Sequence, residues 1–329
     1  MKILHICAGW QKWNGAANIA RMIMDEQRRE GHKVSFATWA KVRELRAADE
    51  VWIHCGWLPC LWWAALWGRN VRWMPEACYD PVRLKFHGWK KWLVGPIERW
   101  CLRRCSRIVA TCEAEAEWIR AYEPRVKSIE VTDIKRFFNL NPVNPVNPVK
   151  KDLHLLYLGR RHPLKGLSYL ETALATYYNK WSSVPSSLAP TTACADNPSS
   201  NPSRKAATYY NKCPIEFRVV SDAFGDELER VWDWCDVLVL PTLSENFGLV
   251  IAEALERGKR VITTDGAPAW GENLSRVERV DGGMWSRYGG RLIYLKGYRD
   301  GTPEDRVRLL KSAIENLLSR ASLTPPAAK

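Results

Sequence analysis

VLVLPTLSENFGLVIAEALERGKRVITTDGAPAW, residues 237–270, is the most regular stretch of this chain. Residues 237–240 form an apolar run typical of a buried strand, and Pro241 ends it because proline has no N–H group to give to a sheet. A polar turn follows, and apolar residues at helical spacing then predict a helix over 249–256. Residues 261–264 resume an extended chain. A strand, a turn, a helix and a second strand in this order are typical of a parallel α/β domain.

The turn that follows the first strand has the properties of an anion-binding site. Phe247, Gly248 and Leu249 lie where the predicted helix begins, and unpaired backbone N–H groups and the positive end of the helix dipole attract phosphate there. Two carboxylates, Glu245 and Glu253, flank this point and are separated by seven residues. Carboxylates are poor phosphate ligands but good acceptors for sugar hydroxyls. The turn therefore suits a sugar that is attached to a diphosphate.

The motif SENFGLVIAE resembles the signature of the family-four retaining glycosyltransferases, in which two glutamates are separated by seven residues. This resemblance implies a GT-B fold, in which two Rossmann-like α/β domains face each other across a cleft. It also implies a nucleotide-sugar donor, most often a UDP-sugar, and transfer with retention of anomeric configuration. By the same resemblance Glu245 holds the donor sugar, Glu253 holds the ribose, and the other donor-binding residues are Asn246, Phe247, Gly248 and Leu249.

A second motif, GRRHPLKG at residues 159–166, follows a strand predicted over 153–158. Basic residues on a turn bounded by glycines suit a diphosphate, because arginine offers a fork of donors and lysine a point charge. In the family an arginine and a lysine at matching places bind the donor diphosphate, which implies that role for Arg160 and Lys165. Arg161 is an alternative to Arg160.

The N-terminal residues predict another parallel α/β unit. A strand over 2–8, a loop over 9–15, a helix over 17–30 and a strand over 34–38 follow in order. Gly15 would let the backbone approach a ligand closely, and NGAAN resembles the acceptor-side loop of the same family. The alternative is ordinary turn chemistry.

The segment PEACYDP, residues 75–81, follows a predicted strand and departs from the family pattern. Many relatives carry an acceptor-side histidine near this position, whereas this chain offers Glu76 and Asp80. We expect Glu76 to bind an acceptor hydroxyl. The alternative is a loop carboxylate that pairs with Arg72 or Arg83.

The composition also divides the chain into domains. Proline at every third position of NPVNPVNPVKK excludes a helix or a central strand and predicts an extended linker. A segment rich in Ser, Pro and Asn predicts a disordered insertion. The family resemblance implies that the terminal helix crosses back to the first domain. The predicted divisions are a first domain over 1–140, the linker over 141–151, a second domain over 152–302 with the insertion at 182–205, and a terminal helix over 303–320.

A net charge of +13 predicts an anionic partner. The Lys and Arg residues are dispersed and no nucleic-acid-binding module is present, which argues against nucleic acid as the partner. The ten cysteines show no zinc-site spacing and no Asp-x-Asp motif occurs, so we expect reduced thiols, a cytoplasmic protein, and neither a metal nor another cofactor.

Tryptophan-rich segments raise the question of a membrane. Residues 51–68 lack charged side chains, but Gly56 and Pro59 interrupt the run and favour a buried strand followed by a core helix over a membrane span. Residues 85–104 combine basic and aromatic side chains, which suits either a peripheral contact with an anionic membrane or a solvated helix face.

Taken together, these patterns predict a glycosyltransferase that moves a sugar from a nucleotide-sugar to a glycan or lipid-linked acceptor in bacterial surface polysaccharide synthesis. The alternatives are a nucleotide-sugar epimerase of the same fold and a basic nucleic-acid-binding protein.

Overall fold

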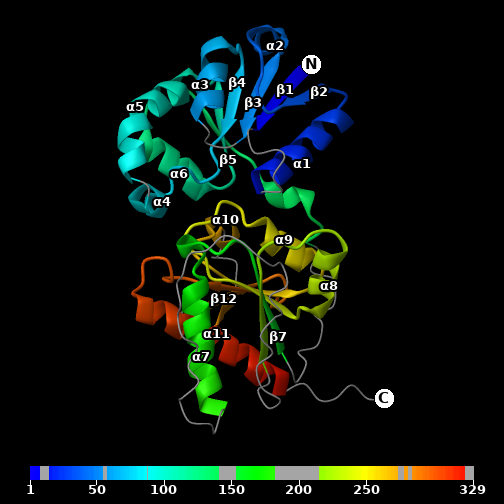
Figure 1. Cartoon of the computed structure of the whole chain (residues 1–329), viewed down its shortest axis with the longest axis vertical. Helices are drawn as coiled ribbons and strands as arrows, with labels where there is room; N and C mark the ends of the chain where they lie inside the picture. The colour runs from blue at the N-terminus through cyan, green and yellow to red at the C-terminus, as the bar shows by residue number, and fades with distance from the viewer. Residues whose placement is uncertain are drawn as a thin grey trace, which may run out of the picture.

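A computed structural model describes residues 1–7, 15–54, 58–86, 88–140, 153–181, 215–272, 278–280 and 284–322. Two α/β lobes are stacked along the long axis of the molecule, each with its own sheet (Figure 1). The predicted architecture of two Rossmann-like domains is therefore confirmed. The linker predicted at 141–151 and the insertion predicted at 182–205 lie outside the described residues.

The first domain contains a six-stranded parallel sheet in the order β2-β1-β3-β4-β5-β6. Each strand is short and largely apolar, and β3 is buried along its whole length, as expected for a sheet with helices on both faces. The strands are β1 Lys2–Cys7, β2 Lys33–Ala37, β3 Glu50–His54, β4 Val71–Met74, β5 Arg107–Ala110 and β6 Ile129–Val131. The helices are α1 Gly15–Arg29, α2 Val42–Ala47, α3 Leu58–Trp67, α4 Pro81–Phe86, α5 Gly88–Arg104 and α6 Glu113–Tyr122, with the 3-10 helix η1 Ile134–Phe137.

The second domain contains a seven-stranded sheet in the order β11-β12-β13-β10-β9-β7-β8. Its β7, β8, β9, β10 and β13 are parallel, whereas β11 and β12 form an antiparallel edge that the sequence did not predict. The strands are β7 Leu153–Leu158, β8 Ile215–Val220, β9 Val237–Leu240, β10 Arg260–Thr264, β11 Glu278–Val280, β12 Met284–Arg287 and β13 Leu292–Leu295. The helices are α7 Leu167–Trp181, α8 Asp226–Trp234, α9 Leu249–Glu256, α10 Pro268–Gly271 and α11 Pro303–Ser322, with η2 Pro163–Lys165.

The terminal helix α11 differs from the family-based expectation. It packs against α7 and β13 of its own domain, and in Figure 1 it lies far from the first domain. Its apolar residues Leu310, Ile314 and Leu317, at helical spacing, are buried in the core of the second domain. The expectation that this helix crosses back is therefore wrong for the described residues, and it is the loop before α11 that reaches the first domain, through an ion pair between Arg299 and Asp80.

Candidate functional site

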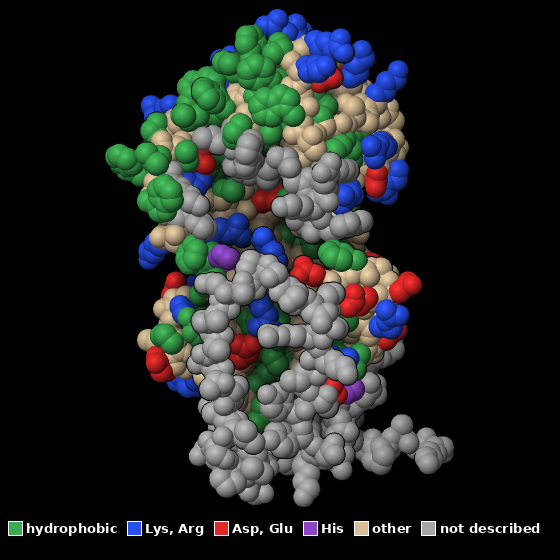
Figure 2. Space-filling model, viewed as in Figure 1, with side chains coloured by type: hydrophobic (Ala, Val, Ile, Leu, Met, Phe, Trp, Pro, Cys, Tyr) green, Lys and Arg blue, Asp and Glu red, His purple; other side chains and the backbone are tan. Residues whose placement is uncertain are grey.

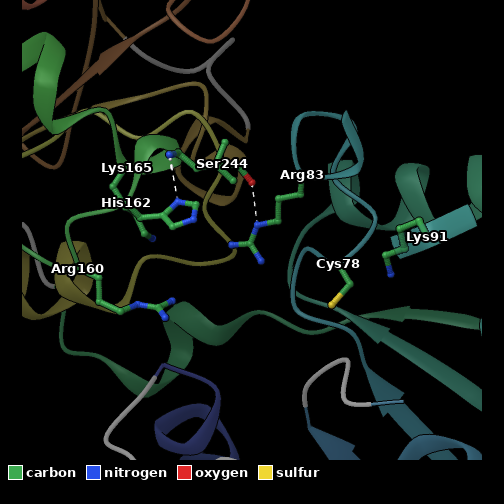
Figure 3. Close-up of a pocket in the computed structure, with 8 residues that line it drawn as sticks. Cys78, Arg83, Lys91, Arg160, His162, Lys165 and Ser244 are labelled. Atoms are coloured by element: carbon green, nitrogen blue, oxygen red, sulfur yellow. Dashed lines mark hydrogen bonds between the residues drawn. The ribbon is translucent and has the colours of Figure 1, made fainter. Parts of the chain in front are cut away.

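A cavity of about 320 Å³ lies between the two domains, a size within the usual range for small-molecule sites. Both domains contribute to its walls, and basic side chains predominate (Figure 3). The first domain supplies Cys78, Arg83 and Lys91, and the second supplies Arg160, His162, Leu164, Lys165 and Ser244. Sequence reasoning had placed Arg160 and Lys165 at the donor site, and the structure brings both to this cavity.

The loop between β9 and α9 carries most of the predicted donor residues, and its own domain holds it in place. The predicted strand and helix on either side are confirmed at Val237–Leu240 and Leu249–Glu256. The Glu245 N–H donates to the Gly266 carbonyl at 2.8 Å, and a Cβ at Gly266 would lie 2.1 Å from the carbonyl oxygen of Thr242. Only glycine allows β10 and this loop to approach so closely.

Two predicted site residues contact each other directly. Lys165 Nζ donates to Glu245 Oε2, and both side chains are largely buried. Burial by itself raises the pKa of Glu245, but the charge and the hydrogen bond of Lys165 outweigh it, and the pKa lies below its usual value. Glu245 is therefore ionised. The Lys165 ammonium has three N–H donors and retains two for other partners.

The structure distinguishes the two arginines of GRRHPLKG. Arg160 lines the cavity (Figure 3). Its carbonyl accepts a hydrogen bond from the Tyr157 hydroxyl at 2.8 Å. Arg161 does not line the cavity and pairs with Glu171 at 3.6 Å on the exposed surface. Arg160 is therefore the better candidate for a phosphate ligand.

The remaining predicted donor residues lie around the start of α9. Gly248 is its N-cap, with a left-handed φ of 73°. The Phe247 side chain is buried against Trp270, which leaves only its backbone for a ligand. Glu253 lies on α9, outside the cavity lining; burial raises the pKa of Glu253 and the Arg257 charge opposes that rise.

Side chains of the first domain also contact the loop between β9 and α9, residues 241–248, which we call the donor loop. Arg83 Nε donates to Ser244 Oγ at 3.0 Å. The Thr111 hydroxyl oxygen lies 2.8 Å from Glu115 Oε2 and 2.9 Å from Asn246 Oδ1. Because a hydroxyl has one hydrogen, the network is best satisfied when Thr111 donates to Glu115 and the Asn246 amide turns its nitrogen toward Thr111. That orientation also gives a partner to Asn246 Nδ2, which otherwise has none among the described residues.

The acceptor-side predictions are met only in part. Glu76 and Ala77 both have left-handed backbone conformations, with φ values of 55° and 57°. The Ala77 N–H donates to the buried Glu115 carboxylate at 2.5 Å, and the Glu76 carbonyl accepts from Arg83 Nη1 at 3.3 Å. The Glu76 side chain is not part of the cavity lining, so its contact with an acceptor stays a prediction. Of the two alternative partners, Arg72 pairs with Glu50 and Glu130, and Arg83 contacts the Glu76 carbonyl.

Gly15 begins α1 and faces the start of α9 across the domain boundary. A Cβ at Gly15 would lie 3.8 Å from Leu249 Cδ1, so the two helix N-termini approach each other. The rest of the predicted acceptor loop, residues 9–14, lies outside the described residues.

Burial makes the one cysteine of the described cavity lining unreactive. Burial raises the pKa of Cys78 to about 12, so its thiol stays protonated at neutral pH and is a poor nucleophile. Within the described ranges no three His, Cys, Asp or Glu side chains are grouped so that they would hold a metal ion.

Sequence reasoning missed Arg83, Lys91 and Ser244 as cavity residues and Thr111 as a contact of the donor loop. Arg83 had been considered only as a partner for Glu76. The only sequence feature that could have indicated a site role for Arg83 is its position just before the basic segment that begins at Lys85.

Comparison with known families and structures agrees with this geometry. Residues 36–132 match the family described as glycosyl transferase 4-like domain, and residues 152–281 match glycosyl transferases group 1. A search of curated proteins gave no significant match.

Several solved structures share the fold. Sucrose-phosphate synthase (tll1590) from Thermosynechococcus elongatus aligns with a TM-score of 0.63 and 14% identity, covering 98% of this chain and 90% of the other. Alr3699/HepE from Anabaena, in complex with UDP-glucose, aligns with a TM-score of 0.57 and 14% identity, covering 98% and 94%. WaaG, a glycosyltransferase involved in lipopolysaccharide biosynthesis, aligns with a TM-score of 0.50 and 10% identity, covering 98% and 95%. Such low identities establish the fold, and the two glycosyltransferase domain matches, one in each half of the chain, support its assignment as a glycosyltransferase of the GT-B type.

Proposed function

We propose that this glycosyltransferase moves a sugar from a UDP-sugar to a glycan or glycolipid acceptor, with retention of configuration and without a metal. The observation that carries the proposal is the meeting of Arg160, Lys165 and the ionised Glu245 beside a basic cavity between the domains. Cationic side chains suit the diphosphate of the donor, and a carboxylate suits the hydroxyls of its sugar. HepE, which aligns over nearly the whole chain, was solved with UDP-glucose, and that supports a UDP-sugar donor here.

In the proposed reaction the acceptor hydroxyl oxygen forms a bond to the anomeric carbon on the face that the diphosphate leaves. The bond between that carbon and the diphosphate oxygen breaks, and its electron pair stays on the diphosphate. The acceptor proton passes to a phosphate oxygen of the donor, so no side chain acts as a nucleophile. Arg160 and Lys165 stabilise the negative charge that develops on the leaving diphosphate, a role that removes the need for a metal ion.

The donor assignment is tested by thermal unfolding with UDP-, GDP- and ADP-sugars in turn, with and without a chelator. We expect one UDP-sugar to raise the melting temperature and EDTA to leave the shift unchanged, because bound ligand stabilises the folded state by mass action. Stabilisation by none of the three nucleotide classes would refute the assignment. Formation of an isomeric nucleotide-sugar without any acceptor would instead indicate an epimerase.

For the acceptor we propose a lipid-linked or membrane-associated glycan, because the first domain exposes an aromatic and basic surface. Trp89 and Trp92 of α5 are 68% and 80% exposed, and Phe86 and Leu93 beside them are also exposed. Figure 2 shows such apolar side chains gathered over the first domain, with Lys and Arg side chains around them. Aromatic side chains next to basic ones suit the interface of an anionic membrane. In the part of the chain that the structure describes, no helix is both long and apolar enough to span a bilayer.

Vesicle flotation tests this surface. The wild type should float with vesicles that contain phosphatidylglycerol and much less with pure phosphatidylcholine, and salt should weaken the binding. Replacing Trp89 and Trp92 by Ser should abolish flotation, whereas Phe224→Ser, which removes an exposed aromatic ring from the second domain, should not. Equal flotation of all three proteins would contradict the proposed membrane surface.

A further inference from the structure

Among the described residues, Arg83 is the one arginine that the first domain contributes to the cavity lining. It lies on the short helix α4 and reaches across the domain boundary, where its guanidinium faces the wall formed by His162 and Arg160 (Figure 3). We propose that Arg83 binds the diphosphate of the donor and stabilises it as the leaving group. This inference rests on the proposed function and adds a residue that neither the sequence motifs nor the family matches assign to the donor.

The hydrogen bonds of Arg83 fix its side chain and leave donors available. Nε donates to Ser244 Oγ at 3.0 Å, and Nη1 donates to the Glu76 carbonyl at 3.3 Å. A guanidinium has five N–H donors, so three are not used by these two bonds. Two fixed contacts and three available donors describe a side chain that is oriented before a ligand binds.

Arg83 differs in its ion pairing from the two lysines that line the same cavity. Lys91 pairs with the buried Glu98 at 2.7 Å, and Lys165 pairs with Glu245. Arg83 contacts a hydroxyl and a carbonyl, both neutral, and within the described residues it forms no ion pair with a carboxylate. On the opposite wall, the ion pair with Glu171 belongs to Arg161, and in the described part of the chain no carboxylate pairs with Arg160. The cavity thus presents two arginines without a directly paired carboxylate, one from each domain, while the charge of Arg83 also acts on the buried Glu245 and Glu115. A diphosphate suits two such guanidinium groups in charge and in hydrogen bonding.

The position of Arg83 also connects donor binding to the contact between the domains. Because Arg83 belongs to the first domain and Arg160 to the second, their charges converge only when the domains are close together. In the transfer step the bond from the anomeric carbon to the diphosphate breaks and its electron pair remains on the diphosphate. Arg83 then binds more negative charge than before, which favours transfer over the reactant state.

The test compares wild type, Arg83→Gln and Arg83→Lys by calorimetric titration with UDP, UMP and inorganic pyrophosphate. Lys85→Gln is the matched control, since Lys85 lies on the same helix, is exposed and does not line the cavity. We expect Arg83→Gln to lower the affinity for UDP and pyrophosphate by at least about tenfold, because a charge-assisted hydrogen bond to the second phosphate is lost. The affinity for UMP, which has one phosphate, should fall by much less. Arg83→Lys should recover part of that affinity, and Lys85→Gln should stay within about twofold of the wild type.

Three results would overturn the inference. The first is an unchanged pyrophosphate affinity in Arg83→Gln, and the second is an equal loss of affinity for UMP and UDP, which would indicate a merely structural tie between the domains. A higher KM for the acceptor with unchanged UDP affinity would also overturn it, because Arg83 would then serve the acceptor. A different result would contradict the proposed function. If the wild type binds pyrophosphate in an Arg83-dependent manner but binds no UDP, the UDP-sugar assignment is wrong and the role of Arg83 stands.

Discussion

Acidification from pH 7 to pH 5 should destabilise the first domain through a pair of buried histidines. His5 of β1 and His54 of β3 are fully buried, their rings are stacked 5.1 Å apart, and His5 Nδ1 lies 2.9 Å from His54 Nε2. His5 Nε2 lies 2.7 Å from Gln27 Oε1. Since that oxygen accepts, Nε2 carries the proton, and Nδ1 accepts from His54. In this tautomer of His54, a second proton on His5 would face the Nε2–H group of His54, so the bond between the two rings would be lost.

The magnitude follows from the lowered pKa of His5. Burial is the main cause and the Arg28 charge adds to it, while the Gln27 hydrogen bond opposes them; together they lower the pKa from 6.5 to about 4. Above pH 6.5 both the folded and the unfolded chain are neutral at this site. Below pH 6.5 His5 binds a proton in the unfolded chain but stays neutral in the folded chain. The free energy of unfolding therefore falls between pH 6.5 and pH 4. For His5 alone this is about 2 kcal/mol between pH 7 and pH 5, and His54, whose pKa burial also lowers, acts in the same direction.

Urea unfolding of wild type and His5→Gln at both pH values provides the assay. Gln keeps a hydrogen-bonding amide but does not titrate, so the variant should lose about 2 kcal/mol less than the wild type on acidification. The second domain and the titrating groups away from this pair contribute equally to both proteins and cancel in the difference. The contribution of His54, which contacts His5 directly, is measured from its own titration in each protein. The chain has six histidines, few enough for direct titration by NMR. Equal losses in the two proteins, or a His5 pKa above 6 in the NMR titration, would refute the reasoning.

Three further changes have defined outcomes. Glu253→Ala should weaken donor binding at least about tenfold in calorimetry if that carboxylate accepts a charge-assisted hydrogen bond from the ribose, and unchanged affinity would rule out the role. Gly166→Ala should lower the melting temperature strongly, because Gly166 has a φ of 66° and a Cβ there would lie 1.9 Å from a carbonyl oxygen of the donor loop. Gly258→Ala is the control, because Gly258 has a similar φ of 71° but no atom lies within 4 Å of the added Cβ. This variant should lose only about 1 kcal/mol of stability. Asp80→Asn removes the buried carboxylate that pairs with Arg299 across the domains, and the radius of gyration in small-angle scattering should increase; an unchanged radius would show that this pair does not hold the domains together.

The sequence was informative wherever the signal is local. The strand, turn and helix from 237 to 256 were predicted at their observed bounds, because an apolar run, a proline and a helical apolar pattern lie next to one another. Lys165 and Glu245 were predicted separately, from two motifs, and the structure shows that they meet. In contrast, the short antiparallel edge of the second sheet has no strong local pattern and was not predicted.

Residues that enter the site through contacts between domains could not be predicted in this way. Arg83 and Ser244 are 161 positions apart, and Thr111 and Asn246 are 135 positions apart. Neither pair lies in one motif, and a basic residue on an unpredicted short helix looks like any solvated charge. Helix α11 shows the opposite error, because the family's arrangement was carried over where this chain packs its apolar face on α7 instead.

The ion pair between Lys165 and Glu245 bears on how a donor would bind. A diphosphate is an anion, so it can replace the carboxylate as the partner of Lys165, and the ammonium need not be left unpaired in a largely buried place. Glu245 would at the same time exchange an ammonium for sugar hydroxyls, which are weaker partners, while the nearby Arg83 charge still favours its ionised form. The exchange is therefore most favourable for a ligand that brings both the anion and the hydroxyls. Inorganic pyrophosphate supplies one half of that requirement and a free sugar the other, so a nucleotide-sugar should bind more tightly than the two fragments predict separately.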